Sequence, residues 1–157
     1  MIALLGDTHL PRGSRRLPEQ CLRLLEEADL ILHVGDFTAA SVLDELRSLA
    51  PVAAVRGNMD ERSLREELPE REVVEAEGVR VGLVHDAGLE PGRHERLRSW
   101  FPACDVVAYG HSHISEVARS GEAWIVNPGS PTERRRAPVR SMAVLRAGRP
   151  ALVDLGR

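Results

Sequence analysis

The chain has 157 residues, of which 43% are hydrophobic, and a formal net charge of −3. This length predicts one domain, residues 1–157, with a sizeable hydrophobic core. The negative charge and the small number of aromatic residues argue against nucleic acid as a stable partner. All 21 basic residues are arginine, which excludes a catalytic lysine, a Schiff base and a P-loop.

Cysteine usage and hydropathy point to the cytoplasm. Cys21 and Cys104 lie far apart and form no CxxC pair, so neither a disulfide framework nor a thiolate metal site is expected. The N-terminal apolar run stops at Asp7, which is too short for a signal peptide. No segment approaches the roughly 18 apolar residues of a membrane span. We therefore expect a cytoplasmic protein without a membrane partner.

The first part of the chain alternates between strand-like and helix-like segments. Short apolar runs predict strands over 2–6, 30–35 and 52–57. Helical periodicity predicts helices over 17–28, 39–49 and 60–68. Six apolar side chains have the spacing of buried helical faces, namely Leu22, Leu25 and Ala28 in the first helix and Val42, Leu43 and Leu46 in the second.

Beyond residue 70 the predicted strands follow one another closely. They cover residues 72–77, 79–85, 105–110, 123–127, 141–147 and 151–155. Residues 76–79 and 146–150 predict tight turns, which imply antiparallel pairing, whereas the earlier alternation implies a parallel core. We therefore expect an α/β protein with mixed sheets flanked by helices.

A potential metal ligand stands at or just beyond the end of five of these strands. The set comprises Asp7 and His9 in "GDTH", Asp36 in "GD", Asn58 in "GN", His85 after "GLV", and His111 and His113 in "GHSH". Each one alone fits a turn residue, a helix cap or a structural histidine. Because ligand sites form at the carboxyl ends of strands in open α/β sheets, their joint occurrence favours a metal site.

The number and type of these ligands indicate the chemistry. Seven N and O donors are too many for one tetrahedral ion and suit two divalent ions about 3.5–4 Å apart. The absence of thiolates favours Mn²⁺, Fe²⁺, Ni²⁺ or Zn²⁺. Two such ions lower the pKa of a bridging water and clamp the attacking and leaving oxygens of a phosphoryl group.

The ordered motifs "GDTH", "GD", "GNMD", a strand-end histidine and "GHSH" resemble the calcineurin-like metallophosphoesterase superfamily. Within it, the chain is similar to small bacterial and archaeal phosphodiesterases related to the retromer subunit vacuolar sorting protein 29. The resemblance runs from residue 6 to about residue 130, where "NPGS" ends. It implies a four-layer α/β/β/α sandwich with two mixed sheets and two bound divalent ions. Mn²⁺ is the expected metal, and Zn²⁺, Fe²⁺ and Ni²⁺ are the alternatives.

The resemblance also implies a role for each ligand. One ion would be held by Asp7, His9, Asp36 and His113. The other would be held by a set that also serves as the catalytic residues, namely Asp36 as the bridge, Asn58, His85 and His111. The expected reaction is hydrolysis of a phosphodiester in a small phosphate-ester substrate, by attack of a hydroxide that bridges the ions.

Met59 separates the possible reaction classes. Phosphatase branches of the superfamily carry a histidine after Gly-Asn, and a thioether cannot donate a proton to a leaving group. Met59 therefore favours a phosphodiesterase over the alternative of a phosphomonoesterase. A second alternative is a non-catalytic scaffold like the retromer subunit, but none of the ligand histidines is lost here. The expected partners are a small phosphate-ester substrate and, as a further alternative, a second copy of the chain in a homo-oligomer.

Two arginine-rich loops, residues 11–16 and 132–140, are expected to border the metal edge. Candidate substrate contacts are Arg12, Arg56 and Arg134, which would bind a second phosphate or attract an anionic ester. The alternative is a solvated run of charge in each loop and a surface ion pair at Arg56.

Four other polar residues have mainly structural interpretations. We expect Asp60 to cap the helix at 61–68, a role compatible with supporting a ligand histidine. We expect Asp86 to begin a turn, with a hydrogen bond that orients His85 as the alternative. His33 is expected to be a buried, hydrogen-bonded histidine, and His94 a solvated position on a helix.

Overall fold

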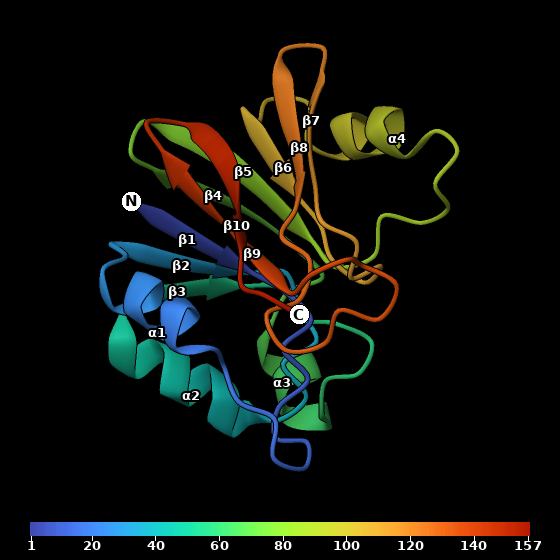
Figure 1. Ribbon diagram of the computed structural model, residues 1–157. Coiled ribbons are helices and arrows are strands. Elements are labelled where there is room, and N and C mark those ends of the chain that lie inside the picture. The colour runs from blue at the N-terminus through green and yellow to red at the C-terminus, as the bar shows by residue number, and fades with distance from the viewer.

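The computed structural model describes residues 1–157 as two five-stranded sheets and four α-helices (Figure 1). In chain order the elements are β1 (Ile2–Leu5), α1 (Glu19–Glu26), β2 (Leu30–His33), α2 (Ala40–Leu49), β3 (Val52–Ala54), α3 (Arg62–Glu67), β4 (Arg71–Ala76), β5 (Val79–Val84), α4 (Arg93–Trp100), β6 (Val106–Ala108), β7 (Glu116–Ser120), β8 (Ala123–Asn127), β9 (Ser141–Arg146) and β10 (Arg149–Asp154).

Both sheets are mixed. The first has the order β10-β9-β1-β2-β3, in which β1, β2 and β3 are parallel and β9 and β10 are antiparallel. The second has the order β4-β5-β6-β8-β7, with a parallel centre and an antiparallel strand at each edge. Helical crossovers connect the parallel strands β1, β2 and β3 and the pair β5 and β6, whereas β4, β7 and β10 are edge strands formed by hairpins.

Alternation along β1 explains how the layers stack. Ala3 and Leu5 belong to the core that also contains Leu25 of α1 and Leu43 of α2, whereas Ile2 and Leu4 belong to a second core between the two sheets. A third core lies under α4, where Leu97 packs against the outer face of the second sheet. Figure 1 shows α1 and α2 outside one sheet and α4 outside the other. This is the expected α/β/β/α sandwich.

The tight turns are confirmed, and their backbone explains the hairpins. Glu77 and Gly78 join β4 to β5 with φ of 53° and 76°, and Ala147 and Gly148 join β9 to β10 with φ of 49° and 73°. Two successive left-handed residues give the turn whose twist matches antiparallel strands.

Two elements and one helical face differ from the prediction. Strand β7 was not predicted, and of helix α4 only the helical position of His94 was, because both elements are largely polar and pack on β8. Leu22 is 37% exposed, and Cys21 takes its place in the core. Helix α1 begins two residues later than expected, and its buried face contains Cys21 and Leu25.

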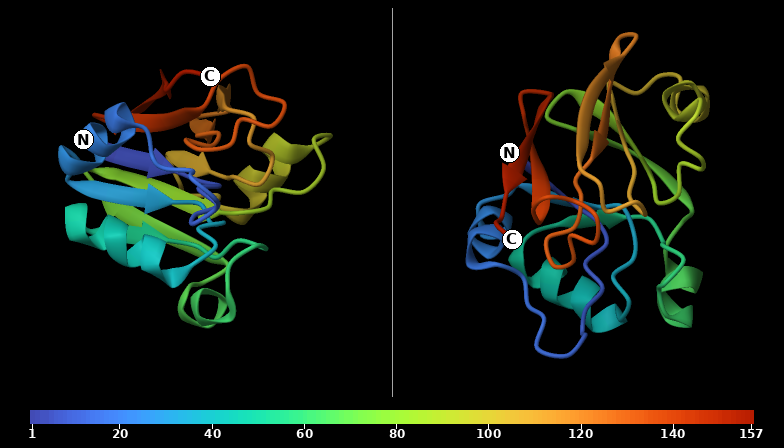
Figure 2. Two further views of the ribbon diagram at one scale, coloured as in Figure 1. Left: turned by 60° about the horizontal axis from the view of Figure 1, so that its bottom comes forward. Right: turned by 45° about the vertical axis from the view of Figure 1, so that its right-hand side comes forward.

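The carboxyl ends of β1, β2 and β3 lie at one end of the first sheet, because the three strands are parallel. Figure 2 shows the loops that follow these strands gathered there, next to the loop that follows β6. None of the helices is long and apolar enough to cross a lipid bilayer.

Candidate metal centre

The structure brings all seven predicted ligands together in one chain of close contacts. They come from the segments that follow β1, β2, β3, β5 and β6. Five of the side chains are buried, whereas the other two, Asn58 and His111, are exposed. Their use as ligands is a prediction that rests on the distances below.

The first group joins the end of β1 to the loop after β6. The Nε2 atoms of His9 and His113 lie 3.2 Å apart, although 104 residues separate the two histidines. Asp7 Oδ1 lies 3.4 Å from Nε2 of His113 and 3.9 Å from Nε2 of His9. One ligand atom from each of these three residues therefore points toward a common centre.

The second group lies beside the first and shares carboxylates with it. Asp36 Oδ2 lies 3.5 Å from Nε2 of His9 and 3.4 Å from Nε2 of His85. Asn58 Oδ1 lies 3.0 Å from Nε2 of His85 and 3.1 Å from Nδ1 of His111. Asp7, Asp36 and His85 also form a compact triad of ligand atoms by themselves. Both carboxylates thus face two groups of donors.

The other ring nitrogens of two histidines are held by carbonyl groups. Nδ1–H of His85 donates to the Val34 carbonyl at 2.7 Å, and Nδ1–H of His113 donates to the Glu133 carbonyl at 2.8 Å. In the neutral ring, Nε2 then presents a lone pair toward the centre. A carbonyl partner of this kind fixes the orientation of a metal-binding histidine.

The donor set fits a cation. In the neutral tautomers above, Nε2 of His85 faces only acceptor oxygens, from Asp36 and Asn58. Asp7 Oδ1 is buried and accepts no hydrogen bond. Lone pairs that converge without donors repel one another, and divalent cations between them would remove that cost. The seven residues would hold such ions.

The pKa values reflect the same crowding. Burial lowers the pKa of His9, and the nearby carboxylates of Asp36 and Asp7 compensate only in part. Burial alone would raise the pKa of Asp36, but contacts with His85 and the Met59 N–H outweigh it, and the pKa is lowered. The pKa of His85 is raised, because Asp36 and Asp7 outweigh the effect of burial.

Most of the ligands have a backbone conformation that is rare for residues with a side chain. The φ angle is positive, between 45° and 71°, at Asp7, His9, Asp36, His111 and His113. Such residues cost free energy and persist where the surrounding contacts fix them, which is common at functional sites.

Glycines in the motifs make room for the ligands. A Cβ atom at Gly57 would lie 2.1 Å from Oδ1 of Asp36, so the loop after β3 approaches this carboxylate only because residue 57 has no side chain. A Cβ atom at Gly110 would lie 3.0 Å from Oδ2 of Asp7. The repeated glycine before a ligand is thus a packing requirement of the site.

Asp60 has a different role from the one predicted. Helix α3 begins after Glu61 and has no side-chain cap, so the capping prediction is wrong. The buried Asp60 carboxylate instead accepts hydrogen bonds from the backbone N–H groups of Gly57, Thr38 and Asp36. Nothing in the local sequence indicates these contacts, because two of the donors lie more than 20 residues away.

Three of the other structural predictions can be compared with the contacts. Asp86 accepts from the N–H of Gly88 and forms the expected turn, and His33 is fully buried and hydrogen-bonded, as expected. His94 is not simply solvated, because its Nε2 lies 2.8 Å from Oε1 of Glu116.

The candidate substrate arginines have separate environments. Arg12 is exposed and lies 3.9 Å from Glu133. Arg56 lies 3.6 Å from Glu70 and borders a cavity of about 240 Å³ that also touches Asn58 and His85. Arg134 donates to the Ala137 carbonyl of its own loop. Contact of these arginines with a substrate remains a prediction.

Comparison with known proteins finds one family along most of the chain. The family model of the calcineurin-like phosphoesterase superfamily domain matches residues 1–149. A probable metallophosphoesterase of Methanothermobacter thermautotrophicus is 37% identical over 137 residues, which cover 86% of this chain and 79% of the relative.

Solved structures share the fold. Vps29 of Entamoeba histolytica in complex with Zn²⁺ superposes with a TM-score of 0.75 and 25% identity, over 99% of both chains. An archaeal phosphodiesterase superposes with a TM-score of 0.74 over 98% of both chains, and its identity of 19% shows the fold alone.

Proposed function

Because the chain belongs to the calcineurin-like phosphoesterase superfamily, we propose that it is a metal-dependent hydrolase that cleaves phosphodiesters with two divalent ions, preferably Mn²⁺. The observation that carries the proposal is Asp36 Oδ2, which lies within 3.5 Å of histidine nitrogens from both groups of ligands. An oxygen in this place suits a bridge between two ions. When bound, such a pair supplies an activated water and positive charge against the phosphoryl oxygens.

Met59 supports a diester rather than a monoester as substrate. Met59 is 57% exposed beside Asn58, and a thioether offers no proton to a departing alkoxide. A phosphodiester with a good leaving group reacts without that proton. A phosphomonoesterase is the alternative reaction class at the same site.

The likeness to Vps29 favours one other candidate function, a protein-binding scaffold. The complete set of seven ligands at one edge argues against it, because a scaffold has no need for buried acceptors that face one another. Absence of turnover in a metal-loaded protein would favour the scaffold.

The test is hydrolysis by purified protein reconstituted with Mn²⁺, Zn²⁺, Fe²⁺ or Ni²⁺. We expect metal-dependent release of 4-nitrophenol from bis(4-nitrophenyl) phosphate, abolished in Asp36→Asn and kept in Asp44→Asn. Asp44 is the matched control because its side chain is 74% exposed on α2, away from the ligands. Near-normal turnover in Asp36→Asn would contradict the bridging role.

A further inference from the structure

Three arginines from two separate loops converge on the side chain of Glu133. Arg15 Nη1 lies 3.5 Å and Arg135 Nε lies 3.7 Å from Oε2 of Glu133, while Arg12 Nη1 lies 3.9 Å from Oε1. Three guanidinium groups against one carboxylate leave an excess of positive charge. We call Arg12, Arg15, Arg135 and Glu133 the arginine cluster.

The arginine cluster is incompletely satisfied from within the protein. Nη1 of Arg15 and Oε2 of Glu133 are both buried, and neither makes a hydrogen bond. The two side chains are each 22% exposed, so water reaches them only in part. Their separation of 3.5 Å brings opposite charges together without the short, bidentate geometry that an arginine and an oxyanion prefer.

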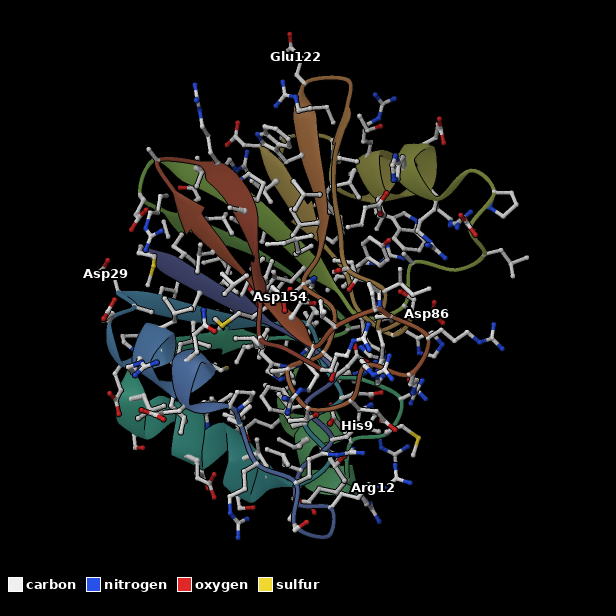
Figure 3. The ribbon with its side chains drawn as sticks, viewed as in Figure 1. His9, Arg12, Asp29, Asp86, Glu122 and Asp154 are labelled. Atoms are coloured by element: carbon white, nitrogen blue, oxygen red, sulfur yellow. The ribbon has the colours of Figure 1, made fainter.

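The arginine cluster is fixed against the candidate metal centre. The backbone carbonyl of Glu133 accepts the hydrogen bond from Nδ1 of His113. Thr132 Oγ1 donates to the carbonyl of Thr8 at 2.6 Å, between the ligands Asp7 and His9. In Figure 3, His9 and Arg12 lie on the same side of the molecule, on the segment after β1. A group bound at the cluster is therefore next to the ligand set.

We propose that the arginine cluster is a binding subsite for a second phosphate of the substrate, with Glu133 as the internal anion that this phosphate displaces. A planar guanidinium group binds two oxygens of a phosphate at once. The single carboxylate of Glu133 has only two oxygens and cannot bind three arginines in this way. The proposal rests on the proposed function and narrows its substrate class. The preferred substrate is a phosphodiester that carries another phosphate away from the scissile one.

Of the three arginines that the sequence suggests, the contacts retain Arg12 in the arginine cluster and replace the other two. Arg134 is occupied by the carbonyl of Ala137, and Arg56 by Glu70 and the carbonyl of Arg65. Arg15 and Arg135 combine proximity to Glu133 with free hydrogen-bonding capacity. These two residues therefore determine the specificity for the second phosphate.

The first test measures binding without metal and without turnover. Inorganic pyrophosphate is titrated calorimetrically into chelator-treated protein. We expect Arg15→Ala and Arg135→Ala each to weaken binding about tenfold, or about 1.4 kcal/mol, because each removes a charge-assisted hydrogen bond to the phosphate. Glu133→Gln should tighten binding about threefold, because the competing carboxylate is removed.

The matched control is Arg16→Ala, which removes the same charge from the same loop. Arg16 is exposed and makes no ion pair, so pyrophosphate binding should stay unchanged. Two results would overturn the subsite, namely equal loss of pyrophosphate affinity in Arg16→Ala and Arg15→Ala, or unchanged affinity in Glu133→Gln. Either result would mean that pyrophosphate is attracted only by the general positive charge of the loops.

The second test uses two substrates with one leaving group. Thymidine 5′-(4-nitrophenyl phosphate) is compared with the same ester carrying a 3′-phosphate. We expect wild type to prefer the 3′-phosphorylated ester in kcat/KM, and Arg15→Ala to lose that preference through KM. If both esters are hydrolysed and the ratio of their kcat/KM values is the same in wild type and all variants, the subsite is wrong but the proposed function stands. Turnover of neither ester, with pyrophosphate binding still dependent on Arg15, would contradict the proposed function alone.

Discussion

Oδ2 of Asp60 accepts a hydrogen bond of 3.3 Å from the backbone N–H of Asp36, which lies 24 residues earlier in the chain. The same oxygen accepts from Gly57 at 2.7 Å, and Oδ1 accepts from Thr38 at 2.9 Å. One buried carboxylate thus joins the loop after β2 to the loop after β3. Burial raises the pKa of Asp60, and the three N–H groups oppose that rise. Asp60 thereby positions the backbone of Asp36 without facing the ligand atoms.

Asp60→Ala should lower both stability and metal affinity. Three buried or half-buried N–H groups would lose their acceptor, at about 1–3 kcal/mol each, so we expect the free energy of unfolding to fall by at least about 3 kcal/mol. Urea unfolding of the metal-free protein measures this change. Asp60→Asn keeps one acceptor oxygen and should lose less.

Asp44→Ala on the exposed face of α2 is the control for Asp60→Ala and should change the free energy of unfolding by no more than about 0.5 kcal/mol. A similar small change in Asp60→Ala would mean that water replaces the carboxylate. In that case Asp60 would not organise the two loops.

Divalent metal should stabilise the protein and bind close to two ions per chain. Ions would relieve the repulsion between the acceptors of Asp7, Asp36 and His85, so added Mn²⁺ should raise Tm and a chelator should lower it again. Elemental analysis after dialysis gives the stoichiometry. His113→Ala removes one donor and should reduce the bound metal, with Tm measured in parallel. Binding no higher than background in wild type would refute the metal centre.

The fold was predictable where local pattern and tertiary packing agree. Strand β1 is a continuous apolar run, because both of its faces are buried. Strand β7 was not predicted because it is a half-exposed edge strand with the sequence "EVARS", formed by pairing with β8. Helix α4 buries only Leu97 fully, so its sequence carries little amphipathic signal.

The candidate site was predictable for a topological reason. Parallel strands end at the same edge of a sheet. The residues just beyond β1, β2 and β3 therefore lie close together, whatever conformation their loops adopt. The groups that hold the ligands in place were not predictable. The carbonyls of Val34 and Glu133 and the carboxylate of Asp60 act across long sequence separations, and a backbone carbonyl has no signature in a sequence.

Stability should fall with decreasing pH because of His33. Burial, together with the nearby His85, lowers the pKa of His33 to about 3 from its ordinary 6.5. The neutral ring accepts a hydrogen bond from the N–H of Gly35 at Nδ1. The unfolded chain therefore binds a proton that the folded chain does not. The His33 contribution is complete above 6.5 and is lost as pH falls from 6.5 toward 3, at up to about 1.4 kcal/mol per pH unit.

His33→Gln tests this assignment, because Gln retains a donor and an acceptor but does not titrate. Urea unfolding of both metal-free proteins is measured between about pH 8 and about pH 5. The difference at the upper end gives the loss of packing against Phe37. As the pH falls from this upper end, the free energy of unfolding should decrease more steeply in wild type than in His33→Gln. Parallel decreases in the two proteins would contradict the role of His33.

Met59→His should improve hydrolysis of phosphate esters with poor leaving groups. Met59 is 57% exposed, and its backbone N–H donates to Oδ1 of Asp36 at 2.7 Å, so an imidazole at this position starts next to the ligands. A good leaving group departs without a proton, whereas a poor one needs a donor, and general acid catalysis contributes about 10²–10⁴-fold. We expect wild type to prefer bis(4-nitrophenyl) phosphate over 4-nitrophenyl phosphate, and the variant to narrow that preference.

A leaving-group series separates proton donation from a change in binding. In Met59→His, kcat/KM should rise more for phenyl phosphate than for 4-nitrophenyl phosphate, because only the phenoxide of higher pKa needs the donor. Met59→Gln has a similar size without an acidic proton, and should leave the ratio of the two rates as in wild type. An equal rise for both esters would indicate a binding effect. If wild type itself prefers the monoester by about tenfold, or about 1.4 kcal/mol in transition-state binding, the proposed preference for diesters is wrong.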